Sequence, residues 1–292
     1  MNILITGKTS RIGNAFMEYM KDRYPGEMEI EAISLRGEEW KSQDWSAYDA
    51  ILHAVGVTKA DTAGVSNDQE QHYYAVNRDL ADEAAQKAKS DGVKHFVYLS
   101  TMMVYGNSAP IGQTFTIDKD TQPDPQSVYG KSKLAGEVAT QETLKDSSTI
   151  LTIIREPVVY GEHIDGELQK LLQLSRKLGI FPRIESSKSY IYEGNLCECF
   201  RQVLLNKISG ILCPQNKEQP TTTDLYVTMR AIQGKGCMTP KHLKDFLKAL
   251  SHITGYVNVV YNDMKYTQET SVIEGIEYQV FTLEESLQRC LK

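Results

Sequence analysis

The stretch that decides the fold is residues 2–13, which read NILITGKTSRIG. An apolar run that begins at Ile3 predicts a short strand, and two glycines, Gly7 and Gly13, enclose a turn that opens a helix. Glycine permits a tight bend and a close backbone approach to phosphate, and the first N–H groups of a helix attract an anion. Such turns often carry a third glycine, and Ser10, a small residue, still fits in its place. We therefore expect a phosphate-binding turn whose contacts come from Gly7, Ser10, Arg11, Ile12 and Gly13.

Beyond this turn, short apolar runs alternate with segments of helical period. The expected strands are residues 2–6, 29–34, 50–53, 95–100 and 150–155. The expected helices between them are residues 12–23, 74–89 and 129–144. The connection between the second and third strands lacks apolar periodicity, so we expect a loop or a single turn there. Because a crossover between parallel strands needs about a dozen residues and is usually a helix, the pattern predicts the α/β class, with a Rossmann-type doubly wound parallel sheet.

The alternation stops near Pro157. Helices are expected at residues 167–177, 195–205, 223–232 and 241–250, separated by stretches that contain Gly and Pro. We therefore expect an NAD(P)-binding Rossmann core over residues 1–160. Residues 161–292 are expected to form mainly a smaller, mixed α/β substrate-binding lobe, packed with the core as one unit.

The composition narrows the class of protein. The chain has 292 residues, of which 41% are hydrophobic, so it can bury a large core and is too apolar for a disordered chain. Its net charge of −6 argues against nucleic acid as a partner. No run of 18 apolar residues predicts a membrane span, and five cysteines without paired CxxC spacing predict neither a disulfide framework nor a metal site. Since the first residues read as a strand rather than a signal peptide, we expect a cytoplasmic protein.

The end of the second expected strand bears on the choice of cofactor. Ser34, Leu35 and Arg36 stand where an acidic residue would bind both ribose hydroxyls of NAD. A small residue followed by arginine leaves room for a 2′-phosphate and supplies its countercharge, so the sequence favours NADP(H). An ordinary solvated role for Arg36 is the alternative. Asp44 and Trp45 are expected to bind and cover an edge of the adenine.

A second pattern carries the chemistry. Tyr129 and Lys133 are four residues apart in an expected helix, so they share a face and the ammonium lies near the phenol. A phenol with an ordinary pKa of about 10 is a poor base, and a neighbouring cation favours its ionised form, which can exchange a proton with a sugar hydroxyl. Ser100 and Thr101 stand at the end of a strand, where doubly wound sheets bind ligands. Taken singly, each pattern also has a simpler explanation, in chance spacing or in backbone capping.

Together these residues resemble an extended short-chain dehydrogenase/reductase of the nucleotide-sugar epimerase/dehydratase type, over nearly the whole chain. The matching motifs are Thr6-Gly7 with Gly13, Leu52-His53-Ala54-Val55-Gly56, Val76-Asn77, Ser100-Thr101 with Val104-Tyr105-Gly106, Tyr129 with Lys133, Arg155 with Pro157-Val158-Val159-Tyr160-Gly161, and Tyr190-Ile191-Tyr192-Glu193-Gly194-Asn195-Leu196. Bacterial enzymes of capsule and O-antigen polysaccharide biosynthesis are the nearest likeness. The motifs are specific for the superfamily and weak for the substrate.

The resemblance implies a role for each matched position. Tyr129 would be the acid/base, Lys133 would bind the nicotinamide ribose, and Thr101, preceded by Ser100, would hydrogen-bond the reacting oxygen. The further cofactor contacts that it implies are Ala54, Val55, Gly56, Asn77, Pro157 and Val159. The substrate contacts that it implies are Tyr129, Thr101, Tyr190 and, against the nucleotide diphosphate, Lys188. Members of this family commonly dimerise through two helices each, so a homodimer through residues 74–89 and 129–144 is expected.

Several positions depart from the family patterns. Met102 and Met103 replace the Asp-Glu pair of 4,6-dehydratases, so dehydration is not expected. Val158 stands where UDP-galactose 4-epimerases have asparagine, and Glu156 replaces a commonly apolar or proline neighbour for no reason visible in the sequence. The predicted function is hydride transfer at C4 of a nucleotide-linked hexose, with UDP as the expected nucleotide, by a 4-epimerase or an NADPH-dependent 4-ketoreductase. A non-catalytic dinucleotide-sensing protein on the same fold is the alternative.

Overall fold

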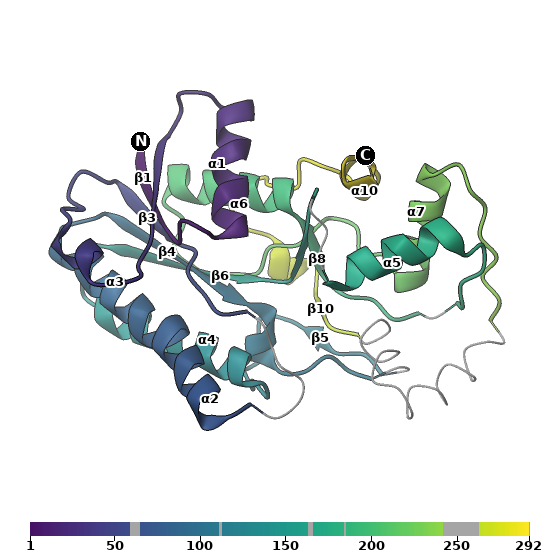
Figure 1. Ribbon diagram of the computed structural model, residues 1–292, viewed down its shortest axis with the longest axis horizontal. Helices are drawn as coiled ribbons and strands as arrows, with labels where there is room; N and C mark the ends of the chain where they lie inside the picture. The colour runs from purple at the N-terminus through teal and green to yellow at the C-terminus, as the bar shows by residue number, and fades with distance from the viewer. Residues whose placement is uncertain (59–64, 111–112, 163–165, 184, 242–262, 292) are drawn as a thin grey trace.

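A six-stranded parallel sheet forms the centre of the protein (Figure 1). The computed structural model describes residues 1–58, 65–110, 113–162, 166–183, 185–241 and 263–291. In order across the sheet, the strands are β2 (Glu29–Ile33), β1 (Asn2–Thr6), β3 (Ala50–His53), β4 (His95–Thr101), β6 (Ile150–Glu156) and β9 (Gly210–Leu212). The strand order reverses at β1 and β3, and ligands of doubly wound sheets bind outside the carboxyl ends of the strands at such a point.

Helices cover both faces of this sheet, as Figure 1 shows. One face carries α1 (Arg11–Arg23) and α6 (Glu193–Asn206), and the other carries α2 (Asn67–Tyr74), α3 (Leu80–Ser90) and α4 (Val128–Leu144). Alternate residues of a strand point to opposite faces. Ile3 and Ile5 of β1 therefore lie in one core with Phe16 and Phe200, whereas Leu4 lies in a second core with the alanines of α3.

α2 and α3 form one long helical segment with a π-helical turn, Ala75–Asp79, between them. The segment begins at Asn67 rather than at the expected Tyr74, because Ser66 and Gln69 form a capping box ahead of a polar first turn. Within the π turn, the carbonyl of Asn77 accepts a hydrogen bond of 2.8 Å from the hydroxyl of Tyr98 on β4. The π turn is thus tied directly to the central sheet.

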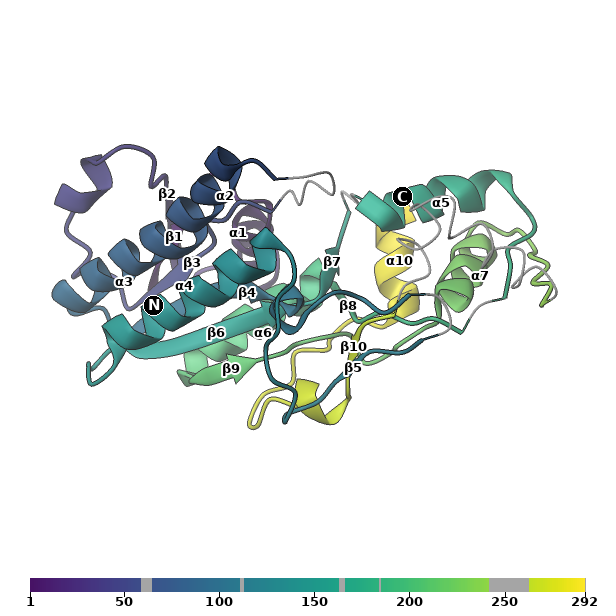
Figure 2. The ribbon, with the colours of Figure 1, turned by 90° about the horizontal axis from the view of Figure 1, so that it is seen from below.

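A smaller mixed α/β lobe lies beside the sheet (Figure 2). It contains α5 (Gly166–Lys177), α7 (Thr222–Ile232), α10 (Leu283–Leu291) and two small parallel sheets, β7 (Val158–Tyr160) with β8 (Tyr190–Tyr192) and β5 (Thr116–Ile117) with β10 (Lys265–Tyr266). Its core gathers aromatic side chains, among them Tyr160, Tyr226 and Phe281. α6 and β9 follow residue 160 in the chain yet belong to the main sheet and its helical cover, and β5 precedes residue 160 yet pairs in the lobe. Core and lobe therefore exchange segments along the chain.

The expected α/β class with a Rossmann-type parallel sheet is confirmed. All five expected strands are present, with ends within one residue of expectation, and five of the expected helices agree within two residues. The turn expected before β3 is the 3-10 helix η1 (Glu39–Ser42), and two further 3-10 helices are η3 (Met102–Tyr105) and η4 (Glu269–Ser271). The helix expected at residues 241–250 lies outside the described residues apart from its first position. In the part of the chain that the structure describes, no helix combines the length and apolar character needed to span a membrane.

Candidate active site

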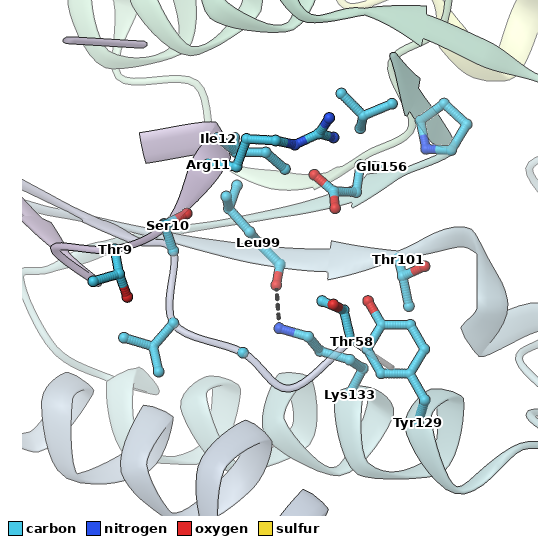
Figure 3. A pocket seen from close by; sticks show the side chains of 15 residues that line it. Thr9, Ser10, Arg11, Ile12, Thr58, Leu99, Thr101, Tyr129, Lys133 and Glu156 are labelled. Atoms are coloured by element: carbon cyan, nitrogen blue, oxygen red, sulfur yellow. Dashed lines mark hydrogen bonds between the residues drawn. The ribbon is translucent and has the colours of Figure 1, made fainter. Parts of the chain in front are cut away.

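The carboxyl ends of the parallel strands open into a cavity of about 440 Å³, which we call the main cavity (Figure 3). Its wall combines the turn after β1, the segment after β3, the ends of β4 and β6, and the start of α4. The lining residues are Thr9, Ser10, Arg11, Ile12, Ala54, Val55, Gly56, Thr58, Leu99, Thr101, Tyr129, Lys133, Glu156, Pro157 and Val159. Most of the expected cofactor and catalytic positions therefore meet in one place.

A second cavity, of about 330 Å³, adjoins the main cavity. Both are lined by Thr9, Ser10, Ala54, Val55 and Gly56. The second cavity is also lined by Ser34 and Arg36, from the end of β2, and by Lys8 of the turn. Two cationic side chains at one cavity suit a phosphate group. The two cavities together provide the elongated space that a dinucleotide requires.

The turn between the cavities has the local structure of a phosphate-binding turn. Gly7 has a φ of +114°, and a Cβ there would lie 3.1 Å from the backbone carbonyl carbon of Ala54, so only glycine fits. A Cβ on Gly13 would lie 2.9 Å from the side chain of Ile5, so glycine lets α1 pack close to the sheet. Ser10 is the N-cap of α1, and its hydroxyl accepts a hydrogen bond of 3.2 Å from the Gly13 N–H. The helix N-terminus at this turn is a ready anion-binding position.

Tyr129 and Lys133 lie in the first turns of α4, on the side that faces the main cavity (Figure 3). The Lys133 ammonium donates a hydrogen bond of 2.8 Å to the carbonyl of Leu99. Thr101 lies near the Tyr129 phenol at the end of β4. The hydroxyl oxygen of Thr101 also accepts a bond of 3.3 Å from the Met103 N–H, which orients it. The expected acid/base, its lysine and the expected substrate hydroxyl thus share one wall.

The electrostatics at Tyr129 differ from the expectation. Burial raises the pKa of Tyr129 above its ordinary value and the charge of Glu156 raises it further, while the neighbouring Thr101 hydroxyl lowers it. Burial lowers the pKa of Lys133, and the charges of Glu156 and Glu137 oppose that shift. The expected lowering of the phenol pKa by Lys133 is not found. The Lys133 ammonium donates its hydrogen bond to the Leu99 carbonyl, and burial disfavours the phenolate form of Tyr129. The phenol is therefore protonated at neutral pH and can donate a proton.

Glu156 lines the main cavity as well. It ends β6 in register with Thr101 on β4. Burial raises the pKa of the Glu156 carboxyl above its ordinary value, while Lys133 and Arg11 lower it. Among the described residues its Oε2 atom has no hydrogen-bond partner, although that atom is buried. A charged residue that ends a buried strand is the sequence signal that points to this position, and the lining positions Thr9, Thr58 and Leu99 carry no comparable signal.

Ser100 does not line either cavity, in contrast to Thr101. Its hydroxyl donates a hydrogen bond to the carboxylate of Glu137, which is buried and paired with Arg155 at 2.6 Å. Arg155 also donates a bond of 2.8 Å to the Tyr105 hydroxyl. The expected catalytic contact of Ser100 is therefore corrected to support of this buried ion pair, whose carboxylate needs donors because water is excluded.

Asn77 supports the cavity wall rather than lining it. Its amide donates hydrogen bonds of 3.2 Å to the Val57 carbonyl and 2.9 Å to the Ser132 hydroxyl. Its side-chain oxygen accepts a bond of 2.9 Å from the Val57 N–H. These bonds hold the segment after β3, whose Ala54, Val55 and Gly56 line both cavities.

Four expected contacts lie away from the two cavities. Trp45 is fully buried and stacks on Trp40 with ring centres 5.6 Å apart, and Asp44 accepts a bond of 2.8 Å from a backbone N–H of its own turn. The Trp45 indole fills the core beside α3, and the adenine contacts expected of Asp44 and Trp45 stay predictions. Lys188 and Tyr190 are buried, and their substrate contacts stay predictions. Across the described ranges, no three His, Cys, Asp or Glu side chains gather as a metal site.

Comparisons with known proteins identify the family of this chain. The model of the RmlD substrate binding domain matches residues 1–179. One relative is an N-acetyl-α-D-glucosaminyl-diphospho-ditrans,octacis-undecaprenol 4-epimerase of Escherichia coli O157:H7, to which the chain is 26% identical over 227 residues. The aligned segment covers 72% of this chain and 65% of that protein. A second relative is a dTDP-4-dehydrorhamnose reductase of Sinorhizobium fredii, to which the chain is 28% identical over 182 residues. That aligned segment covers 60% of this chain and 56% of that protein. The chain thus spans less than two thirds of the length of both relatives.

A solved structure shares the fold over the whole chain. A human epimerase family protein, solved with NADPH, superposes with a TM-score of 0.77 and covers 100% of this chain and 99% of its own, at 18% identity. Because the family match spans more than half of the 292 residues, the chain belongs to the RmlD substrate binding domain family, within the extended short-chain dehydrogenases/reductases that its motifs resemble.

Proposed function

We propose that this protein is an NAD(P)-dependent sugar-nucleotide enzyme that transfers hydride at C4 of a nucleotide-linked hexose, with UDP as the expected nucleotide. The observation that carries the proposal is that Tyr129, Lys133 and Thr101 line the same cavity as Ser10 and Ile12 of the phosphate-binding turn. A nicotinamide dinucleotide, when bound, supplies or accepts the hydride. The relatives are named as an epimerase and a reductase, which supports an enzyme over the dinucleotide-sensing alternative.

The two cavities suit a dinucleotide in one orientation. Arg36 and Lys8 line the second cavity, so an adenosine half that carries a 2′-phosphate fits there. The N-terminus of α1, capped by Ser10, suits the diphosphate. The main cavity is left for the nicotinamide half and the sugar. The charges at the second cavity favour NADP(H) over NAD(H).

Tyr129 is the proton carrier in this proposal. Because burial raises the pKa of its phenol, Tyr129 holds a proton at neutral pH and can give it to the oxygen of a 4-keto sugar as hydride arrives at C4. The Thr101 hydroxyl, which lies beside this phenol at the wall of the main cavity, would hold the same oxygen in line. Lys133 would bind the ribose of the cofactor beside it. The C4 carbonyl becomes a hydroxyl, and the phenolate takes a proton back from solvent.

A 4-ketoreductase and a 4-epimerase are two forms of this function. The protonated phenol of Tyr129 and the Arg36-lined second cavity favour the reductase, which exchanges NADP(H) in every cycle. The match to the 4-epimerase covers more of the chain than the match to the reductase, which favours the epimerase. An epimerase would first remove a proton from the C4 hydroxyl, so its Tyr129 would have to start as a base.

Product analysis distinguishes the two. Purified protein is incubated with UDP-glucose or UDP-N-acetylglucosamine without added cofactor, and a galacto product identifies the epimerase. No conversion, together with NADPH oxidation by a UDP- or dTDP-linked 4-keto sugar, identifies the reductase. Tyr129→Phe is the matched control, because it removes only the reacting hydroxyl. No turnover of any of these sugars by the wild type, with biological activity intact in Tyr129→Phe, overturns the proposal in favour of a non-catalytic protein.

A further inference from the structure

The carboxyl of Glu156 is a cavity group that the proposed mechanism does not use. It stands at the last position of β6, in register with Thr101 of β4. Neighbouring strands lie about 4.8 Å apart, so the two side chains leave the backbone side by side. In Figure 3 both lie at the wall of the main cavity, with Glu156 on the Arg11 side and Thr101 on the Tyr129 side. Glu156 is therefore close to the place where the proposed reaction occurs.

The charges around Glu156 come from two helices. Lys133 and Tyr129 face it from α4, and Arg11 faces it from the start of α1. Lys133 and Arg11 both interact favourably with its carboxylate. Its Oε2 atom is nevertheless buried and has no hydrogen-bond partner among the described residues. A buried acceptor left without a partner is costly, and its presence at a cavity calls for an explanation such as a role in catalysis or in binding.

The dinucleotide orientation indicates which part of a ligand this carboxyl faces. The adenosine half fits the second cavity and the diphosphate fits the turn, so the nicotinamide half remains for the main cavity. The nicotinamide ring carries one positive charge when oxidised and none when reduced. Two cations, Lys133 and Arg11, already lie at this wall, and without Glu156 they would repel the oxidised ring.

We propose that Glu156 is a specificity-determining residue whose carboxylate faces the nicotinamide ring and favours the oxidised over the reduced dinucleotide. This inference rests on the proposed cofactor function. It adds that Glu156 sets the relative affinity of the protein for the oxidised and the reduced dinucleotide. A protein that holds the oxidised form tightly releases it slowly, which suits an enzyme that recycles its cofactor in place. By slowing release of the oxidised dinucleotide, Glu156 favours the epimerase form of the proposed function over the reductase form.

Protonation of the Glu156 carboxyl is linked to binding of the oxidised nicotinamide ring. Burial raises the pKa of Glu156 above the ordinary glutamate value of about 4.3. The charge of an oxidised ring would lower that pKa again, so binding of the oxidised form releases protons at a pH where the free carboxyl is partly protonated. The affinity for the oxidised form therefore rises as pH increases through the titration of Glu156, whereas the affinity for the neutral reduced ring has no such dependence on this group.

Isothermal titration calorimetry with NADP⁺ and with NADPH tests the inference. In Glu156→Gln, which keeps the shape of the side chain and removes its charge, we expect the ratio of NADP⁺ affinity to NADPH affinity to fall about tenfold. Glu162→Gln is the matched control, since Glu162 is exposed, lines neither cavity and changes the net charge equally. The control is expected to keep the wild-type ratio.

A second measurement uses the pH dependence of the same affinity ratio. In the wild type, the affinity ratio is measured at pH 6 and pH 8, and it is expected to rise. Lys133 loses charge in the same direction, so the profile of Glu156→Gln, which retains Lys133, is subtracted. An equal ratio in wild type and Glu156→Gln, with both dinucleotides bound, or a wild-type ratio that is flat with pH, overturns the inference alone. Failure of the wild type to bind either dinucleotide overturns the proposed cofactor function with it.

Discussion

At the scale of single residues, the hydroxyl of Tyr129 carries the proposed chemistry. Tyr129→Phe keeps the ring in its packing and removes the proton donor, so kcat is expected to fall by about 100- to 10,000-fold. The affinity for NADPH should change little, because the phosphate-binding turn and Arg36 are untouched. Steady-state kinetics and calorimetry check the two halves of this prediction. A variant that retained a tenth or more of wild-type kcat would exclude Tyr129 as the acid.

Arg36 is the residue proposed to discriminate between NADPH and NADH. It lines the second cavity together with Lys8, at the end of β2. Arg36→Ala removes a charge-assisted contact with a 2′-phosphate, so the affinity for NADPH is expected to fall about tenfold or more while the affinity for NADH stays within twofold. Arg183→Ala is the control, since Arg183 pairs with Glu185 on the exposed surface and lines neither cavity. Equal losses for NADPH and NADH would show that Arg36 does not read the 2′-phosphate.

At the scale of elements, the sequence predicts strongly periodic segments well and short ones poorly. β1, β3 and α1 agree with expectation because each buries a regular set of apolar side chains. α2 was missed because its residues NDQEQHYY lack an apolar stripe, and its start depends on the Ser66 cap. β5 and β10 have two residues each and pair across 149 positions, so no local pattern reveals them.

The same limit applies to the site. The turn at Gly7–Gly13 and the pair of Tyr129 with Lys133 were predictable, because their chemistry depends on spacing within one element. The position of Ser100 against Glu137 depends on how α4 packs on β4, and the burial of Trp45 depends on Trp40. The charge of Glu156 at the end of an expected strand was visible in the sequence, but its position beside Thr101 depends on the register of β6 against β4. Tertiary contacts of this kind leave no signal in a local pattern.

The contact between α4 and the π turn sets a prediction for stability. A Cβ on Gly136 would lie 2.1 Å from the Asn77 carbonyl oxygen and 2.3 Å from the Tyr98 hydroxyl. Gly136→Ala would separate these elements, so we expect it to destabilise the fold by about 1–3 kcal/mol despite the better helix propensity of alanine. Urea denaturation measures the shift in midpoint. Gly236→Ala is the control, because a Cβ there meets nothing within 4 Å. Similar midpoints for both variants would show that α4 can move without cost.

At the scale of the whole molecule, an acidic protein is proposed to bind two anionic ligands. Its net charge of −6 opposes the approach of a dinucleotide and a nucleotide sugar. The groups that counter this repulsion lie together at the carboxyl edge of one sheet. They are the N-terminus of α1, Lys8 and Arg36 at the second cavity, and Lys133 in the main cavity. The proposed binding site thus gathers cationic groups at one edge of a protein whose net charge is negative.

The helical face formed by α2, α3 and α4 leads to a prediction about assembly. Val138 on α4 is 58% exposed, so it presents an apolar side chain on the outer surface of this helical face. The expected homodimer would use these helices, so we expect the wild type to run at twice the 32.9 kDa mass of one chain in light scattering coupled to size exclusion. Val138→Glu places a charge in that interface and should give monomers, because an unpaired buried charge is costly. Val272→Glu is the control, since Val272 is 73% exposed beside η4 and away from this face. A wild type of 32.9 kDa, or a Val138→Glu variant that remains dimeric, would contradict the prediction and move any dimer contact to another surface.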